Sequence, residues 1–135
     1  MLNGLNHITL STSDLHRSLH FYIDVLGFTG KVKWRQGAYL SSGELWLCLS
    51  LSPTVNRQTD DYTHIAFDVL PEHFLSMQQR LEQFGVKRWK ENRSEGQSIY
   101  ILDPDGHKLE IHVGSLQSRL ESLTSAPYEG LVWMD

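Results

Sequence analysis

Two segments of this 135-residue chain repeat one another: Asn6-His7-Ile8-Thr9-Leu10 and Thr63-His64-Ile65-Ala66-Phe67. Each pairs a histidine with residues that alternate in polarity, the period-two pattern of a strand with one apolar face. In both copies apolar residues then recur at helical spacings, which predicts an amphipathic helix. Three further strand-like segments follow each helix. The sequence therefore predicts two copies of a strand-helix-three-strand module.

Local signals mark where the expected helices begin and end. Asp14 is a suitable N-cap, and Pro71 suits a first helical turn. Gly27 and Gly85 suit the left-handed residue that follows a helix. The stretch Asp103-Pro104-Asp105-Gly106 predicts a tight turn between the last two strands.

The predicted organisation is a single α+β domain over residues 1–135. Module one covers about 1–56, module two about 57–114, and a C-terminal helix capped by Ser115 opens the tail at 115–135. The strands expected after the two helices are 31–34, 38–41, 45–50, 87–90, 98–102 and 108–113. One helix can cover only one face of its sheet, which favours two sheets packed or joined around a cavity.

Composition excludes several classes of protein. A length of 135 residues with 40% hydrophobic residues suits one globular domain. The net charge of -4 argues against a general nucleic-acid binder. No apolar run is long enough for a membrane span and the N-terminus lacks a signal-peptide pattern, so we expect a cytoplasmic protein. The single cysteine, Cys48, excludes an internal disulfide and is expected to be a buried, inert thiol.

Two histidines and one carboxylate form the leading candidate site. His7 and His64 occupy the repeated segments, and Glu110 belongs to the last expected strand, on the same face as His112. Singly, each is more often a packed core residue or a solvated side chain than a ligand. Together they match the imidazole and carboxylate ligands that suit Mn(II) or Fe(II). The remaining histidines receive no role, and His112 is ambiguous.

The chain resembles a known family along nearly its whole length. The residues that carry the resemblance are 4–10, 37–40, 45–50, 61–64, Trp89-Lys90-Glu91-Asn92-Arg93-Ser94-Glu95-Gly96 and 102–114. They are similar to the vicinal oxygen chelate superfamily and, within it, to the fosfomycin-resistance glutathione transferases called FosA. The resemblance implies two βαβββ modules, with mixed sheets curled around a metal cavity and a domain-swapped arrangement in a dimer.

The resemblance also implies a Mn(II) site. His7, His64 and Glu110 would bind the ion between two chains of a homodimer, with module one of one chain facing module two of the other. The matching strand of module one offers only Leu45-Trp46-Leu47 where a carboxylate would complete a second set. We therefore expect one site per chain and two per dimer.

The implied activity is addition of the glutathione thiol to the epoxide of fosfomycin, which confers resistance to that antibiotic. Thr9 would hydrogen-bond the alkoxide that forms when the ring opens, and Trp46 would line the pocket beside the epoxide. Tyr39 would assist ionisation of the thiol, although a tyrosine normally titrates near ~10 and would need a lowered pKa to act as a base.

Three further sets of residues follow from the resemblance. Cationic and hydroxyl donors would bind the phosphonate: Lys90, Ser94, Ser98, Tyr100 and Arg119. Oxygens of one loop would bind K+: Asn92, Ser94, Gly96 and Ser98. Side chains near the thiol channel would bind glutathione: Trp34, Gln36, Ser50 and Arg93.

Other functions remain open on the sequence alone. A related hydrolase would open the same epoxide with water, but it needs an additional glutamate in module one, and residues 31–42 contain no acid; Glu44 is the nearest candidate. A transferase that uses cysteine or bacillithiol is another alternative. Two histidines and a carboxylate also form the Fe(II) triad of ring-cleaving dioxygenases. A non-catalytic drug-binding protein would make the metal ligands dispensable.

Overall fold

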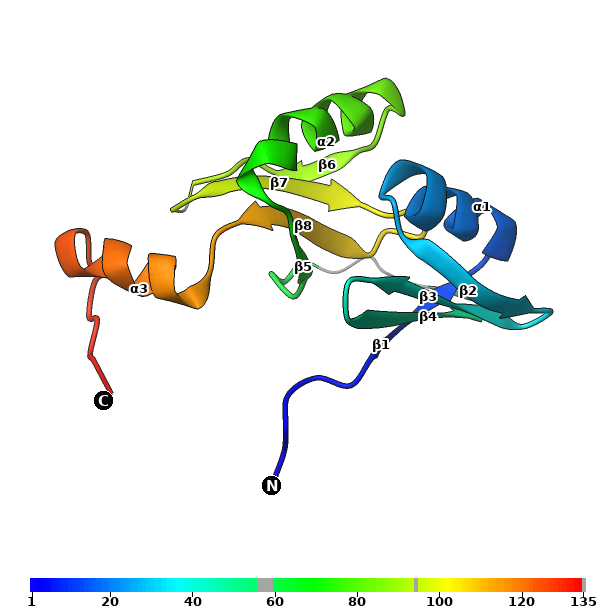
Figure 1. Cartoon of the computed structure of the whole chain (residues 1–135), viewed down its shortest axis with the longest axis horizontal. Coiled ribbons are helices and arrows are strands. Elements are labelled where there is room, and N and C mark those ends of the chain that lie inside the picture. Colours follow the sequence, from blue (N-terminus) through cyan, green and yellow to red (C-terminus); the bar gives the residue numbers. More distant parts are fainter. Residues whose placement is uncertain (56–59, 94, 135) are drawn as a thin grey trace.

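Two four-stranded sheets of the same connectivity build the protein (Figure 1). The computed structural model describes residues 1–55, 60–93 and 95–134. Module one contains β1 (Ile8–Thr12), α1 (Leu15–Leu19), the π-helical segment η1 (His20–Val25), β2 (Thr29–Trp34), β3 (Gly37–Ser42) and β4 (Leu45–Leu51). Module two contains β5 (Ile65–Asp68), α2 (Pro71–Gln83), β6 (Arg88–Lys90), β7 (Gln97–Leu102) and β8 (Lys108–Val113). A last helix, α3 (Leu116–Ser125), follows.

The strand orders confirm the predicted repeat. They are β1-β4-β3-β2 and β5-β8-β7-β6. In each sheet the first strand pairs in parallel with the last, and the other pairs are antiparallel. The α+β fold with two βαβββ modules is therefore confirmed. The predicted module boundary, at residues 56 and 57, lies outside the described residues.

The helix boundaries follow the local signals. The Asp14 side chain accepts a hydrogen bond from the Arg17 N–H and caps α1, and Pro71 stands in the first turn of α2. Ser115 accepts from the Ser118 N–H at the start of α3. Gly27 has a φ of 88° and Gly85 a φ of 65°, where a side chain would strain the backbone. These predictions are confirmed.

The structure differs from the sequence prediction at three places. His7 and His64 come immediately before β1 and β5 instead of lying inside them, because the parallel ladders begin one residue later, at Ile8 and Ile65. The first helix continues as the π-helical segment η1. A period-3.6 pattern does not distinguish that wider turn from an α-helix.

Each sheet buries the face that its helix covers and leaves the other face open. On β3 and β4 the inward residues Leu40, Leu47 and Leu49 are buried, whereas Tyr39 and Trp46, which point the other way, are exposed. In module two Ile99, Ile101, Leu109 and Ile111 join the same core with Phe74 and Leu81 of α2. The open faces are therefore where side chains of both modules can meet a ligand.

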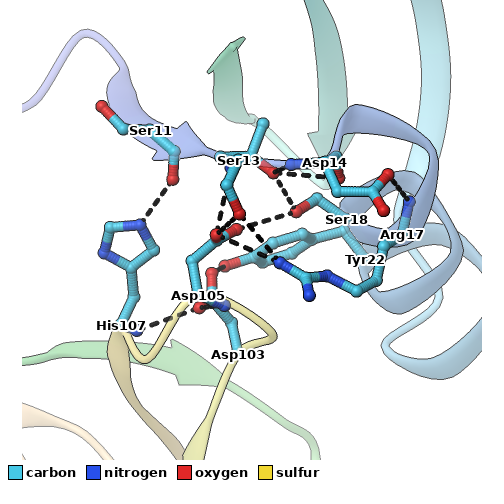
Figure 2. A network of polar contacts seen from close by, with 10 residues as sticks. Ser11, Ser13, Asp14, Arg17, Ser18, Tyr22, Asp103, Asp105 and His107 are labelled. Atoms are coloured by element: carbon cyan, nitrogen blue, oxygen red, sulfur yellow. Dashed lines mark hydrogen bonds and ion pairs between the residues drawn. The ribbon is translucent and has the colours of Figure 1, made fainter. Parts of the chain in front are cut away.

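A network of hydrogen bonds joins the modules at the predicted turn from Asp103 to Gly106 (Figure 2). Asp105 Oδ1 accepts from the Ser13 N–H at 3.0 Å and from the Ser13 hydroxyl at 2.6 Å, and Arg17 adds an ion pair at 3.2 Å. The Tyr22 hydroxyl donates to Asp103 Oδ2 at 2.7 Å. His107 Nε2 donates to the Ser11 carbonyl oxygen at 2.7 Å. The turn of module two is thus fixed to β1 and α1 of module one.

The pKa values of the two carboxyl groups in this network shift in opposite directions. Burial raises the pKa of Asp103, and burial beside Asp103 raises the pKa of Tyr22. Burial would also raise the pKa of Asp105, but the hydrogen bonds from Ser13 and the charge of Arg17 lower it below its usual value. Asp105 is therefore the carboxylate that the fold stabilises in its charged form.

Among the described residues, no helix has the length and apolar character needed to cross a membrane.

We predict that Asp105→Asn lowers the free energy of unfolding at pH 7 by about 3 kcal/mol, because it removes charge-assisted hydrogen bonds from a buried site. A carboxyl whose pKa is lower in the folded chain stabilises above its unfolded value near ~3.9 and loses that contribution as the pH falls through the folded pKa. The deficit of the variant should therefore be constant near neutral pH and shrink as the pH falls below about 5 toward the lowered folded pKa. Urea unfolding of both proteins measures it, with the exposed Asp60→Asn as control. A deficit that is the same at every pH would contradict this role of Asp105.

Candidate functional site

His64 and Glu110 form the centre of the candidate site. His64 Nε2 lies 2.9 Å from Glu110 Oε1, and His64 Nδ1 lies 2.7 Å from the Tyr62 carbonyl oxygen. A carbonyl oxygen only accepts, so Nδ1 carries a hydrogen and Nε2 of the neutral ring presents a lone pair to the carboxylate. Two facing lone pairs repel unless a proton or a cation lies between them. The pair therefore has the chemistry of a cation site.

The separation of these two atoms also fits a metal ion. Two ligand atoms that each lie about 2.1 Å from one octahedral ion, at a right angle, are about 3.0 Å apart. The 2.9 Å between Nε2 and Oε1 matches two neighbouring positions of such an ion. Nδ1 of His64, bonded to a backbone carbonyl, resembles the usual second contact of a metal-bound histidine. The two residues thus fit a divalent cation with oxygen and nitrogen ligands.

Two predicted phosphonate ligands lie in the same row of the sheet as Glu110. Tyr100 is opposite Glu110 in the β7–β8 ladder, and Lys90 is opposite Tyr100 in the β6–β7 ladder. The Lys90 ammonium lies 4.6 Å from the centre of the Tyr100 ring and 5.4 Å from that of Tyr62. Such cation–π contacts hold a cation without neutralising it. A positive charge therefore stands in the same row of the sheet as Glu110, with Tyr100 between them.

Tyr62 contributes to this face although the sequence analysis gave it no role. Its ring lies 4.7 Å from that of His64, centre to centre, and a hydrogen bond with Tyr100 raises its pKa to about 12. The signal available in the sequence was its position two residues before His64, on the same side of an extended segment. The aromatic rings of Tyr62, Tyr100 and Trp89 surround one side of His64.

Ser98 points at the carboxylate. Its hydroxyl lies 2.6 Å from Glu110 Oε2 and 2.6 Å from His112 Nδ1. Within the described residues the Ser98 hydroxyl contacts Glu110 and His112. Its roles toward phosphonate and K+ stay predictions.

The remaining predicted ligands of module two gather around the loop before β7. Arg119 Nε donates to Glu95 Oε2 at 3.0 Å, and this hydrogen bond lowers the pKa of Glu95. The Asn92 amide donates to the Gly96 carbonyl oxygen at 2.8 Å, so two predicted K+ ligands lie together. Arg93 is exposed on this loop. Ser94 lies outside the described residues.

Module one presents a second row of predicted residues. Cys48 lies between Thr9 and Tyr39 in the sheet, paired with one on each side. Ring contacts join His7 to Trp46 at 4.4 Å, Trp46 to Tyr39 at 5.3 Å and Tyr39 to Trp34 at 4.8 Å, centre to centre. Ser50 follows on the same face of β4, and Gln36 lies between β2 and β3. The predicted catalytic residues Thr9 and Tyr39 and the predicted glutathione residues Trp34 and Ser50 thus share one open face, with Gln36 in the turn at its edge and Arg93 on the loop of module two.

The repeat identifies the residue of module one that corresponds to Glu110. Thr9 pairs with Cys48 as Ala66 pairs with Glu110, so Cys48 is the structural counterpart of Glu110. The prediction that this counterpart falls within Leu45–Leu47 is wrong by one residue, because the parallel ladders pair Thr9 with Cys48 and Ala66 with Glu110. Cys48 is buried, as predicted.

One chain brings together only part of the predicted metal set. Across residues 1–55, 60–93 and 95–134, no three His, Cys, Asp or Glu side chains are placed to hold a metal ion. His64 and Glu110 meet, whereas His7 contacts Asn6 and Trp46 of its own module.

Comparisons with known proteins agree with this architecture. The family model described as "Glyoxalase/Bleomycin resistance protein/Dioxygenase superfamily" matches residues 4–111. A glutathione transferase FosA from Serratia marcescens is 53% identical and covers 98% of this chain and 96% of its own length. The chain belongs to this superfamily and, within it, to the FosA family.

More distant relatives share the fold. The metallothiol transferase FosB of Shouchella clausii is 36% identical over 100% of this chain and 97% of its own. A crystal structure of a mutant of the fosfomycin resistance protein FosX from Listeria monocytogenes superposes with a TM-score of 0.81 at 30% identity, over 90% of this chain and 98% of that one. That FosX was complexed with Mn(II) and 1S,2S-dihydroxypropylphosphonic acid.

We predict that Glu110→Gln and His64→Ala each weaken Mn(II) binding at least 100-fold, because each removes one of the two groups that meet at the candidate site. Electron paramagnetic resonance of free Mn(II) during titration measures the affinity. His73→Ala, an exposed histidine of α2, is the matched control and should bind like the parent protein. Parent-like affinity in both site variants would place the metal elsewhere.

Proposed function

We propose that this protein is a Mn(II)-dependent glutathione transferase that opens the epoxide of fosfomycin and thereby confers resistance to the drug. The observation that carries the proposal is the His64–Glu110 pair, with Lys90 in the same row of the sheet as Glu110, in a chain 53% identical to a FosA. A site for a divalent cation with a positive charge in the same row of the sheet suits a small phosphonate. Glutathione is the thiol that maintains reduced cytosolic proteins, so the proposal includes a cytoplasmic location.

The proposed assembly is a homodimer whose sites are shared between chains. Trp34, Tyr39 and Trp46 of module one are exposed in a single chain, as is Tyr62 of module two. Exposed aromatic groups of this size mark surfaces that meet a partner or a ligand. In the proposed dimer, His7 of one chain completes the ligand set of His64 and Glu110 in the other, with one site per chain.

The side chains divide the work of the reaction. Mn(II), when bound, would supply a Lewis acid for the charge that develops on the epoxide oxygen. Lys90 and Tyr100 hold the phosphonate, and Arg119 adds positive charge from α3. Thr9 donates a hydrogen bond to the developing alkoxide, while Trp46 covers the carbon skeleton. Tyr39 orients the thiol as it loses its proton.

Two groups of residues complete the proposal. Glutathione binds along module one and the adjacent loop, through Trp34, Gln36, Ser50 and Arg93. K+ binds the loop that contains Asn92, Ser94 and Gly96, with Ser98 at its end. The carbonyl oxygen of Gly96 accepts from Asn92, and the ion would compete with that hydrogen bond.

Addition of a thiol is favoured over addition of water. A hydrolase would need a further carboxylate as general base in module one, and Glu44 is exposed in the turn between β3 and β4. A dioxygenase would need no cation at the position of Lys90. These observations leave the thiol transferase as the function that fits the residues best.

We predict a new phosphorus NMR signal when fosfomycin is incubated with the protein, Mn(II), K+ and glutathione. The signal should require both the metal and the thiol, because the nucleophile is external and the charge on the leaving oxygen needs a Lewis acid. Reactions that lack one component each are the controls. Consumption of fosfomycin without any thiol would identify a hydrolase, and an unchanged spectrum would reject the proposed reaction.

We predict that mixing two inactive variants, His7→Ala and His64→Ala, restores activity. If sites are shared, a mixed dimer has one site with both substitutions and one intact site. Random exchange of subunits makes half of the dimers mixed, so activity should reach about one quarter of the parent value. The measurement is glutathione-dependent loss of fosfomycin after exchange of subunits. No recovery, despite mixed dimers detected by mass spectrometry, would place each complete site within one chain.

A further inference from the structure

His112 lies in a slot that the backbone builds around its ring. A Cβ added to Gly96 would stand 3.0 Å from His112 Cε1 and 2.7 Å from the Val113 carbonyl oxygen, and one added to Gly114 would stand 2.9 Å from His112 Nε2. Both glycines have positive φ, 80° and 141°, so side chains are disfavoured there on conformational grounds as well. The two glycines therefore leave room for one imidazole in one orientation.

The sheet places this ring beside Glu110. His112 and Glu110 are two residues apart on β8 and share a face, and Ser98 is directly opposite His112 on β7. Ser98 Oγ is 2.6 Å from both Glu110 Oε2 and His112 Nδ1, and Nδ1 itself is 3.3 Å from Oε2. Strand register alone brings the three groups together.

The directions of the hydrogen bonds follow from the groups themselves. An ionised carboxylate only accepts, so the single hydroxyl hydrogen of Ser98 goes to Glu110. The Ser98 oxygen must then accept from His112, whose Nδ1 carries the hydrogen. The chain therefore runs from His112 through Ser98 to one oxygen of Glu110, and the other oxygen is left facing His64.

We propose that His112 is a positioning residue that acts through Ser98 to fix the Glu110 carboxylate as a single-oxygen metal ligand. This inference rests on the proposed metal role of Glu110. With Oε2 held by Ser98, only Oε1 would be available to hold a metal ion, so Glu110 would contribute a single oxygen. Outer partners of this kind typically change metal affinity 10–100-fold.

The test compares Mn(II) affinity among variants by electron paramagnetic resonance, in buffer without K+ and without fosfomycin, so that other roles of Ser98 do not contribute. His112→Leu fills the slot but has no donor, and its affinity should fall about 10–100-fold. His112→Asn carries an amide nitrogen one bond from Cγ, where Nδ1 stood, and should stay within about threefold of the parent protein. Ser98→Ala should lose as much as His112→Leu, and His73→Leu is the matched surface control.

The double variant separates a relay from packing. If His112 acts through Ser98, adding His112→Leu to Ser98→Ala should cause little further loss of affinity. Losses that multiply, or a His112→Leu protein with parent-like affinity, would overturn the proposal. If His112→Leu does not fold, parent-like affinity in Ser98→Ala would overturn it alone.

Failure of the proposed reaction is distinguishable from failure of this inference. A parent protein that binds Mn(II) but leaves fosfomycin unchanged would reject the transferase, while the affinities of the variants would still decide the role of His112. A parent protein that binds no Mn(II) would overturn both.

Discussion

The contact between Asp105 and Ser13 fixes how the two halves of this protein meet. A turn of module two inserts its carboxylates against β1 and α1, and Tyr22 and His107 add hydrogen bonds from both sides. Arg80 of α2 also donates to the carbonyl oxygen of Val25, the last residue of η1, at 2.8 Å. This hydrogen bond joins α2 of module two to η1 of module one. Because the modules meet at their helices and at this turn, the opposite faces of both sheets stay open.

The open faces are alike in backbone and unlike in chemistry. Tyr39 and Tyr100 are counterparts: Tyr39 pairs with Cys48 in module one, and Tyr100 pairs with Glu110 in module two. At that position module one has a buried thiol and module two a carboxylate held by Ser98. The charged groups and two of the three candidate metal ligands lie in module two, whereas module one contributes aromatic rings, Thr9 and one histidine. This division suits a site in which one face presents the metal and phosphonate ligands and the other covers them.

The hydrogen bonds around Glu110 fix the orientation of the two candidate metal ligands His64 and Glu110. The carbonyl of Tyr62 fixes the hydrogen of His64 on Nδ1, and Ser98 fixes the direction of the carboxylate. Both constraints come from neighbouring backbone and strand register. A rigid donor set of this kind lowers the reorganisation needed for binding.

Much of this was readable from the chain. Local signals predicted the two modules and the order of strands and helix within each. These signals were alternating polarity, helix caps, glycines after helices and the repeat of the histidine segments, and each acts over a few residues. The same repeat supplied the candidate ligands. The π-helical segment η1 was not readable, since its period is close to that of an α-helix. The role of Asp105 was equally hidden, because its partners are 87 to 92 residues away.

The repeat and the residue types named His7, His64 and Glu110 as candidate ligands, but neither assigns distances. Only the tertiary structure decided that His64 meets Glu110, that Ser98 and His112 stand behind the carboxylate, and that His7 stays with its own module. Local propensity acts between neighbours in the chain, whereas strand pairing brings residues 46 positions apart to within 2.9 Å. Register, which is a property of the paired strands, therefore determines which of the predicted groups touch.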